Sequence, residues 1–164
     1  MEENKNIWKN IVKILINKNY TISTMESCTG GGVVNQITNI QGASAILKES
    51  YITYCNEAKI KQGVSQDIIK KYTVYSKETA CEMAKTVKKI SASKIGIGVT
   101  GQLGRLDPDN PYDKLNHVWF TIITEDNKLI EKEIIVPDED RKKQKDFVIA
   151  KIAETLLEYL NCIE

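Results

Sequence analysis

Hydrophobic positions along the chain follow two periods. Apolar residues recur at helical spacing, which gives one apolar face and predicts helices, over 6–17, 28–39, 44–47, 56–61, 66–71, 76–90 and 138–161. Alternating or continuously apolar runs, which favour strands, lie at 20–25, 49–55, 95–100, 117–124 and 129–136. Strands that alternate with helices are typical of an α/β sheet covered on both faces.

Polar residues between these segments mark where helices and turns begin. Ser44, Asn56, Ser65 and Ser76 each precede a helical pattern and are expected to act as N-caps. The polar turn 125–128 between two strand patterns is a β-hairpin signal, which makes the sheet mixed. We therefore predict a three-layer α/β/α sandwich with a mixed central sheet, folded as a single domain over residues 1–164.

Residues 27–32 join the first expected strand to a helix and contain hydroxyls, a thiol and three consecutive glycines. A glycine turn that enters a helix directs backbone N–H groups and the positive end of the helix dipole at one point. Such a point suits a phosphate or the oxyanion of acyl transfer. A plain connection in which Ser27 or Thr29 caps the helix fits the same residues. The local sequence leaves both interpretations open.

The composition of the chain argues against several classes of partner and cofactor. The 164 residues carry a net charge of +1, so the sequence indicates neither a nucleic-acid nor a membrane partner. The charged residues 1–5 do not resemble a signal peptide, and a cytoplasmic location is expected. The four cysteines form no C-x-x-C pair and His117 is the only histidine, so we expect buried free thiols and neither a metal nor a cofactor.

A serine nucleophile without a histidine needs another base, and a lysine can serve when its amine is neutral. Lys59 is predicted in the first turn of a helix, where the dipole favours the neutral form. Tyr54, near the end of the preceding strand, can relay a proton or orient Lys59. Ser27 then attacks a carbonyl, and amides near Gly30 and Gly31 hold the oxyanion. Considered alone, Lys59 fits an ordinary surface lysine, and Tyr54 fits an ordinary tyrosine of a strand.

Three other residues have competing interpretations. Cys28 is a rival nucleophile, because a thiol at a helix N-terminus can be acidic. Arg141 belongs to a charged run that reads as a solvated helix face, or it reaches a ligand phosphate through its guanidinium. His117, inside a strand pattern, reads as a structural histidine.

Three motifs resemble one known family. Residues 26–31 (ESCTGG), 52–59 (ITYCNEAK) and 99–101 (VTG) resemble the CinA C-terminal domain family, and the resemblance covers about residues 6 to 160. It implies an α/β/α fold without a metal, an expected homo-oligomer such as a dimer, and a stand-alone form without the larger N-terminal domain of the family. It also implies amidohydrolase activity on nicotinamide mononucleotide, a step of pyridine-nucleotide salvage that yields nicotinate mononucleotide and ammonia.

The resemblance assigns roles by position. It places the nucleophile on Ser27 rather than Cys28, with Tyr54 and Lys59 as its partners. Substrate contacts on the phosphate and ribose side are implied for a further set of residues: Thr29, Gly30, Gly31, Thr100, Gly101 and Arg141.

The chain departs from the family pattern in the second half. The usual Thr-Gly-Ile-Ala-Gly-Pro reads TGQLGR over 100–105, and Lys-Pro-Val-Gly before the valine–tryptophan pair is replaced by DKLNH over 113–117. A second arginine one turn after Arg141 is here Lys145. The altered 102–117 loop motivates two alternatives: an amidase with another substrate, or a silent nucleotide-binding or regulatory module.

Overall fold

The computed structural model describes residues 2–110 and 114–163, with side chains described from Asn6 onward. Its strands are β1 (Ile22–Glu26), β2 (Leu47–Ile52), β3 (Ile95–Gly101), β4 (His117–Ile123) and β5 (Leu129–Ile135). They form one sheet in the order β2-β1-β3-β4-β5. Strands β1, β2 and β3 are parallel, while β4 and β5 continue the sheet antiparallel. The mixed sheet and the final hairpin are therefore confirmed.

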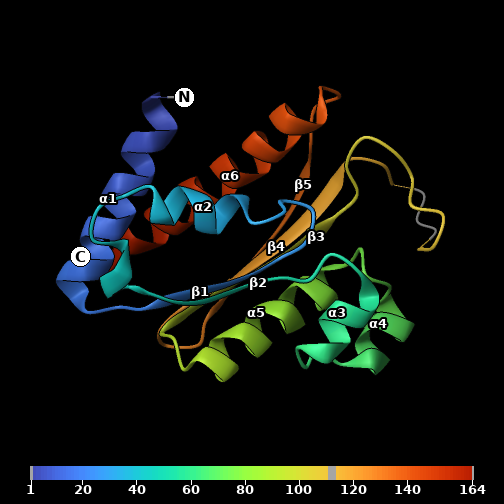
Figure 1. Cartoon of the computed structure of the whole chain (residues 1–164), viewed down its shortest axis with the longest axis horizontal. Helices are drawn as coiled ribbons and strands as arrows, with labels where there is room; N and C mark the ends of the chain where they lie inside the picture. The colour runs from blue at the N-terminus through green and yellow to red at the C-terminus, as the bar shows by residue number, and fades with distance from the viewer. Residues whose placement is uncertain (1, 111–113, 164) are drawn as a thin grey trace.

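Helices cover both faces of this sheet. They are α1 (Glu2–Lys18), α2 (Gly32–Thr38), α3 (Asn56–Lys61), α4 (Gln66–Tyr72), α5 (Lys77–Ser91) and α6 (Arg141–Cys162), with a 3-10 helix η1 at Ala43–Ala45. Figure 1 shows α1, α2 and α6 on one face and α3, α4 and α5 on the other. The three-layer α/β/α architecture is confirmed.

Each face has its own apolar core. The larger cluster joins Trp8 and Leu15 of α1 to Ile97 of β3 and Leu156 of α6. The smaller cluster gathers around Met83 of α5 on the opposite face. Two glycines of β3 allow α5 to approach the sheet: an added Cβ at Gly98 would lie 2.3 Å from the Ala80 carbonyl oxygen, and one at Gly96 would lie 2.5 Å from that of Ala84. This close approach explains why the glycines interrupt an otherwise apolar strand.

Some expected boundaries are wrong. Helix α2 begins at Gly32 rather than near residue 28, because Gly30 and Gly31 have φ of 61° and 88° and form a turn. Strand β2 occupies Leu47–Ile52 rather than 49–55. The helical piece expected after Ser44 is η1, which Gly42 precedes in a left-handed conformation.

Some of the expected helix N-caps are confirmed and others are wrong. Ser65 and Ser76 cap α4 and α5 as predicted, because each hydroxyl accepts the amide N–H three residues later. Asn56 does not cap α3; Cys55 is the N-cap residue, and its side chain makes no capping hydrogen bond. The last helix begins at Arg141, where Asp140 accepts two backbone amides.

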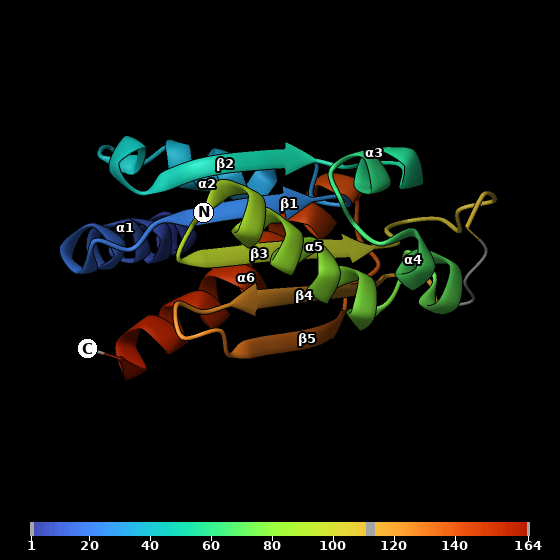
Figure 2. The same cartoon turned by 90° about the horizontal axis from the view of Figure 1, so that it is seen from below.

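The topology gathers three strand ends at one edge. Because β1, β2 and β3 are parallel, Glu26 pairs with both Ile52 and Val99 near their carboxyl ends. Figure 2 shows the three arrowheads pointing the same way, toward α3 and α4. Ligands of such sheets bind beyond these strand ends. Of the expected loop 102–115, residues 111–113 lie outside the described part of the chain.

Candidate active site

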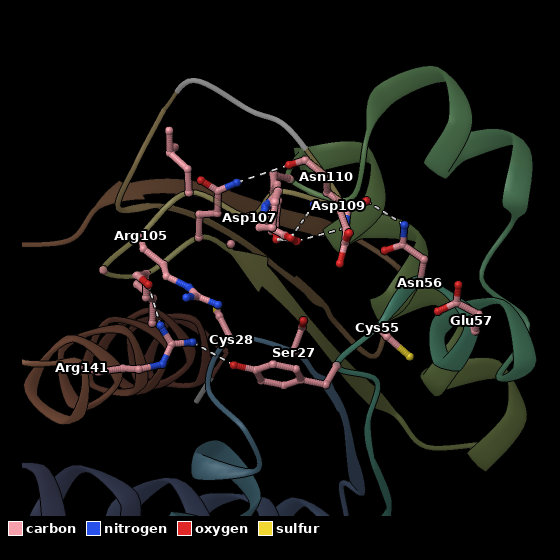
Figure 3. Close-up of a pocket in the computed structure, with 18 residues that line it drawn as sticks. Ser27, Cys28, Cys55, Asn56, Glu57, Arg105, Asp107, Asp109, Asn110 and Arg141 are labelled. Carbon is pink, nitrogen blue, oxygen red and sulfur yellow. Dashed lines mark hydrogen bonds between the residues drawn. The ribbon is translucent and has the colours of Figure 1, made fainter.

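A pocket of about 860 Å³ lies at this edge of the sheet. It is formed by the turn after β1, the segment after β2, Tyr75 before α5, the loop after β3 and the first residue of α6. Its size falls within the range of small-molecule sites. Ser27, Cys28, Tyr54, Gly101 and Arg141 are among the residues that line it, and Figure 3 shows the pocket with Ser27, Cys28 and Arg141 labelled.

Ser27 and Lys59 meet beneath the pocket. A hydrogen bond of 3.2 Å joins Lys59 Nζ to Ser27 Oγ, although the two residues are 32 positions apart. Ser27 is 7% exposed and Lys59 only 2% exposed. The Ser27 amide donates to the Val99 carbonyl, so the β1–β3 pairing continues to the candidate nucleophile. The sheet edge therefore places the hydroxyl at the pocket floor with the amine below it.

Burial makes Lys59 a candidate base. Loss of solvent lowers the pKa of its amine from 10.5 to about 8, against the opposing influence of Cys28, Cys55 and Asp107. The same amine donates to the Thr53 carbonyl at 2.7 Å. Lys59 is the fourth residue of α3, but the helix is so short that this position also lies in its last turn, where the dipole is negative. Burial is the largest cause of the lowered pKa of the amine.

The Glu26 side chain binds at the start of α2, where the sequence suggested a binding point for an anion. Its carboxylate accepts the backbone N–H groups of Val33 and Val34 at 3.0 and 2.9 Å, so it closes the start of α2. It also accepts from the hydroxyls of Thr29 and Thr24. Glu26 is completely buried, and the residue directly before Ser27 is thereby fixed by four hydrogen bonds. Sequence reasoning missed this role.

Cys28 is a poor nucleophile in this setting. Its thiol is 4% exposed, and burial raises its pKa from 9.0 to about 12. Because α2 begins four residues later, the thiol does not sit at the helix N-terminus as the sequence suggested. The positive charge of Lys59 lowers the thiol pKa, but this influence is smaller than that of burial.

Tyr54 is linked to Arg141 rather than to Lys59. Arg141 Nη2 donates to Tyr54 Oη at 2.8 Å, and Nη1 donates to the Leu103 carbonyl. Both residues line the pocket, and Figure 3 shows Arg141 to the left of Ser27. The tyrosine is 58% exposed. The guanidinium thus ties the segment after β2 to the loop after β3.

The resemblance also implied substrate contacts for two threonines and three glycines, and the structure gives each of them a different neighbour. The Thr29 hydroxyl donates to Glu26, and the Thr100 hydroxyl donates to the Val74 carbonyl at 2.8 Å. The Gly30 amide donates to the Ser27 carbonyl. Gly31 faces the Ile52 side chain, which an added Cβ would approach to 2.9 Å. Gly101 lines the pocket.

A polar network after β3 is the main feature that sequence reasoning did not find. Tyr75 Oη and Asn110 Nδ2 donate to the Asp107 carboxylate at 2.6 and 3.0 Å. Asn56 Nδ2 donates to Asn110 Oδ1 at 2.7 Å. Asp107, Asn110, Asn56 and Tyr75 all line the pocket. Partners as distant in sequence as Asp107 and Tyr75, or Asn56 and Asn110, leave no local signal.

Two expectations about the remaining chemistry concern metals and cysteines. Within residues 2–110 and 114–163, no cluster of three or more His, Cys, Asp or Glu side chains is arranged to hold a metal ion. His117 pairs with Glu133 at 2.8 Å, as a structural histidine. All four cysteines are free thiols; Cys28 and Cys81 are buried as expected, but Cys55 and Cys162 are exposed, so the expected burial is wrong for these two. None of the helices in the described part of the chain is long and apolar enough to cross a bilayer.

Comparison with known proteins shows sequence relatives of greater length. A protein of Clostridium novyi, provisionally named competence-damage inducible, is 48% identical over 93 residues, which are 56% of this chain and 22% of that protein. A protein of Caldicellulosiruptor saccharolyticus with the same provisional name is 41% identical over 103 residues, 62% of this chain and 25% of that one. The matches therefore span about a quarter of these relatives.

Solved structures share the fold over nearly the whole chain. A CinA superfamily protein of Klebsiella pneumoniae has a TM-score of 0.89 at 19% identity, covering 96% of this chain and 98% of that one. The competence/damage inducible protein CihA of Agrobacterium tumefaciens has a TM-score of 0.86 at 25% identity, covering 96% and 95%. The model of the CinA C-terminal domain family matches residues 4–160. The chain therefore belongs to the CinA C-terminal domain family.

Proposed function

We propose that this protein is an amidohydrolase that converts nicotinamide mononucleotide to nicotinate mononucleotide and ammonia. The observation that carries the proposal is the buried contact between Lys59 Nζ and Ser27 Oγ at 3.2 Å. With a pKa of about 8, roughly a tenth of the lysine is neutral at pH 7. A neutral amine in hydrogen-bond contact with a hydroxyl is the arrangement that serine nucleophiles without histidine require.

In the first half of the reaction, neutral Lys59 accepts the Ser27 hydroxyl proton while Oγ attacks the carboxamide carbon. The tetrahedral oxyanion is held by amides of the turn after β1. The Gly30 amide is not one of them, because it already donates to the Ser27 carbonyl. The C–N bond then breaks, and the proton on Lys59 passes to the departing nitrogen. Ammonia leaves, and the acyl group stays on Ser27 as an ester.

In the second half, water replaces ammonia. Lys59 accepts a proton from the water as its oxygen attacks the ester carbon. The C–Oγ bond breaks, Ser27 recovers its proton from Lys59, and the carboxylic acid is released as its anion. Glu26 supports both halves by fixing the backbone next to Ser27.

Two arginines on one side of the pocket, which we call its basic side, support the choice of a nucleotide as substrate. Arg105 and Arg141 both line the pocket, and guanidinium groups bind phosphate bidentately. Figure 3 shows both side chains on the same side of Ser27. A carboxamide at Ser27 and a phosphate at Arg141 are joined in nicotinamide mononucleotide, the substrate that the family resemblance implies.

Ammonia release from nicotinamide mononucleotide tests the proposal. The purified protein should release ammonia, and Ser27→Ala should lower kcat/KM by about a thousandfold or more. Cys28→Ala is the matched control at the neighbouring position and should retain most of the activity. Equal release by the Ser27→Ala variant, or its loss only in Cys28→Ala, contradicts the proposal. Thermal stabilisation by the nucleotide without ammonia release supports the alternative binding module.

A further inference from the structure

The pocket carries charges of both signs around Ser27. In Figure 3 the guanidinium groups of Arg105 and Arg141 lie to the left of Ser27, and the Asp107 carboxylate lies above it with Asp109 and Asn110. The basic side already has a proposed partner in the phosphate. The acidic side has none in the proposed function.

Asp107 is held in place by its neighbours. Its Oδ2 accepts from Tyr75 Oη at 2.6 Å and from Asn110 Nδ2 at 3.0 Å, and its Oδ1 accepts the Asp109 amide at 3.0 Å. Asn56 in turn fixes Asn110. These hydrogen bonds, with that of Tyr75 the strongest, lower the pKa of the Asp107 carboxyl. The group is therefore a fixed negative charge at neutral pH.

The state of this carboxylate favours a cation as its partner. Hydrogen bonds from Tyr75, Asp109 and Asn110 occupy most of the roughly four acceptor positions that a carboxylate offers, so little capacity remains for hydroxyl groups of a ligand. None of the ion pairs among the described residues involves Asp107. A partly buried, unpaired charge in a pocket gains free energy when a ligand brings the opposite charge.

The proposed substrate brings such a charge. The ring of nicotinamide mononucleotide is an N-substituted pyridinium, and the carboxamide is attached directly to that ring. A carbonyl carbon held at Ser27 therefore places the ring charge inside the same pocket. Building on the proposed function, we propose that Asp107 is a specificity-determining residue that selects substrates with a cationic pyridinium ring over those with a neutral ring.

The same charge connects substrate binding to the base. Burial lowers the pKa of Lys59, and the negative charge of Asp107 opposes this larger effect by raising it. A pyridinium ring beside Asp107 offsets its negative charge and adds a positive field near the amine. Substrate binding then favours the neutral form of Lys59 that attack requires.

The experiment compares nicotinamide mononucleotide with its neutral dihydropyridine form, which has the same carboxamide, ribose and phosphate. The ratio of kcat/KM for the two compounds is measured in the wild type and in Asp107→Asn, which keeps the shape and removes the charge. Intrinsic reactivity of the two rings cancels in this comparison. We expect the ratio to fall about tenfold in the variant. Its rate should also reach half-maximum at lower pH, because the pKa of Lys59 falls.

Two controls keep the test decisive. Asp138→Asn, an exposed carboxylate outside the pocket, should leave the ratio unchanged. If Asp107→Asn does not fold, the wild-type ratio is followed with ionic strength and should fall as salt screens the ring charge. An equal loss for both compounds in the variant, or a wild-type ratio independent of salt, overturns the inference.

Failure of the proposed function gives a different result. A wild type that releases no ammonia from either compound contradicts the amidase, and the ratio of the two dissociation constants then replaces the kinetic ratio. Equal affinity of the wild type for both compounds overturns the role of Asp107. Tighter binding of the pyridinium form that Asp107→Asn abolishes supports that role without turnover.

Discussion

Two neighbouring turns at the same sheet edge use their polar groups differently. After β1, Glu26 satisfies the first amides of α2, and the Thr29 hydroxyl donates to the same carboxylate. After β2, α3 begins without a side-chain cap, and Lys59 reaches back to Ser27. In the first turn Glu26 occupies the amides that begin α2 and fixes the backbone next to the nucleophile. The second leaves a buried amine whose pKa is lowered.

This contrast changes the meaning of the glycine-rich stretch. Three consecutive glycines before a helix suggested a site for a ligand anion, but the chain supplies the anion itself in Glu26. Gly30 and Gly31 allow the turn that brings this about, through their positive φ. The ligand-facing charges lie instead after β3 and at the start of α6. A rigid turn for the nucleophile is thus combined with a charged wall for the substrate.

Removing the amine should have the largest effect. Lys59→Met leaves Ser27 without a base, and kcat should fall by about a thousandfold. Lys61→Met, on the exposed side of the same helix, is the matched control and should leave kcat nearly unchanged. Steady-state ammonia release measures both variants. Comparable activity of the two would remove Lys59 from the mechanism.

Removing the charge that closes the first turn should have the next largest effect. Glu26→Gln replaces an acceptor of four hydrogen bonds by an amide whose N–H₂ faces buried donors. Urea denaturation should show a loss of about 2 to 3 kcal/mol in the free energy of unfolding. Glu49→Gln, an exposed position on β2, should change it little. A stable Glu26→Gln variant would contradict the rigid-turn half of the comparison.

Lys59 also lowers stability, and the sign follows from its pKa. The folded value of about 8 lies below the ordinary 10.5, so the cost is fully present below pH 8 and disappears as the pH rises toward 10.5. The shift corresponds to about 3 kcal/mol, less about 2 for the hydrogen bonds to Ser27 and Thr53. Lys59→Met should therefore be about 1 kcal/mol more stable at pH 7. A less stable variant at every pH would contradict this balance.

Tyr54 should show the smallest effect. Tyr54→Phe removes one hydrogen bond from Arg141 on an exposed side chain, so KM should rise a few-fold with little change in kcat. A proton relay through Tyr54 predicts a different result, a fall in kcat of a hundredfold or more. The split between KM and kcat decides between these two roles.

The sequence predicts what depends on local pattern or on strand order. Ser65 and Ser76 are recognisable caps because their partners lie three residues away. Ser27 and Lys59 could be paired because parallel strands end at one edge. Glu26 was missed because its partners meet it only after Gly30 and Gly31 turn the chain. Asp107 was missed because Tyr75 lies 32 residues away and is brought near only by the folded sheet.

The pH dependence of ammonia release tests the central claim most directly. If neutral Lys59 activates Ser27, kcat/KM for nicotinamide mononucleotide should rise with pH and become level above an apparent pKa of about 8. The rise reflects deprotonation of the amine in the free enzyme. A rate that does not change between about pH 6 and pH 9, or an apparent pKa near the ordinary lysine value of 10.5, would contradict it.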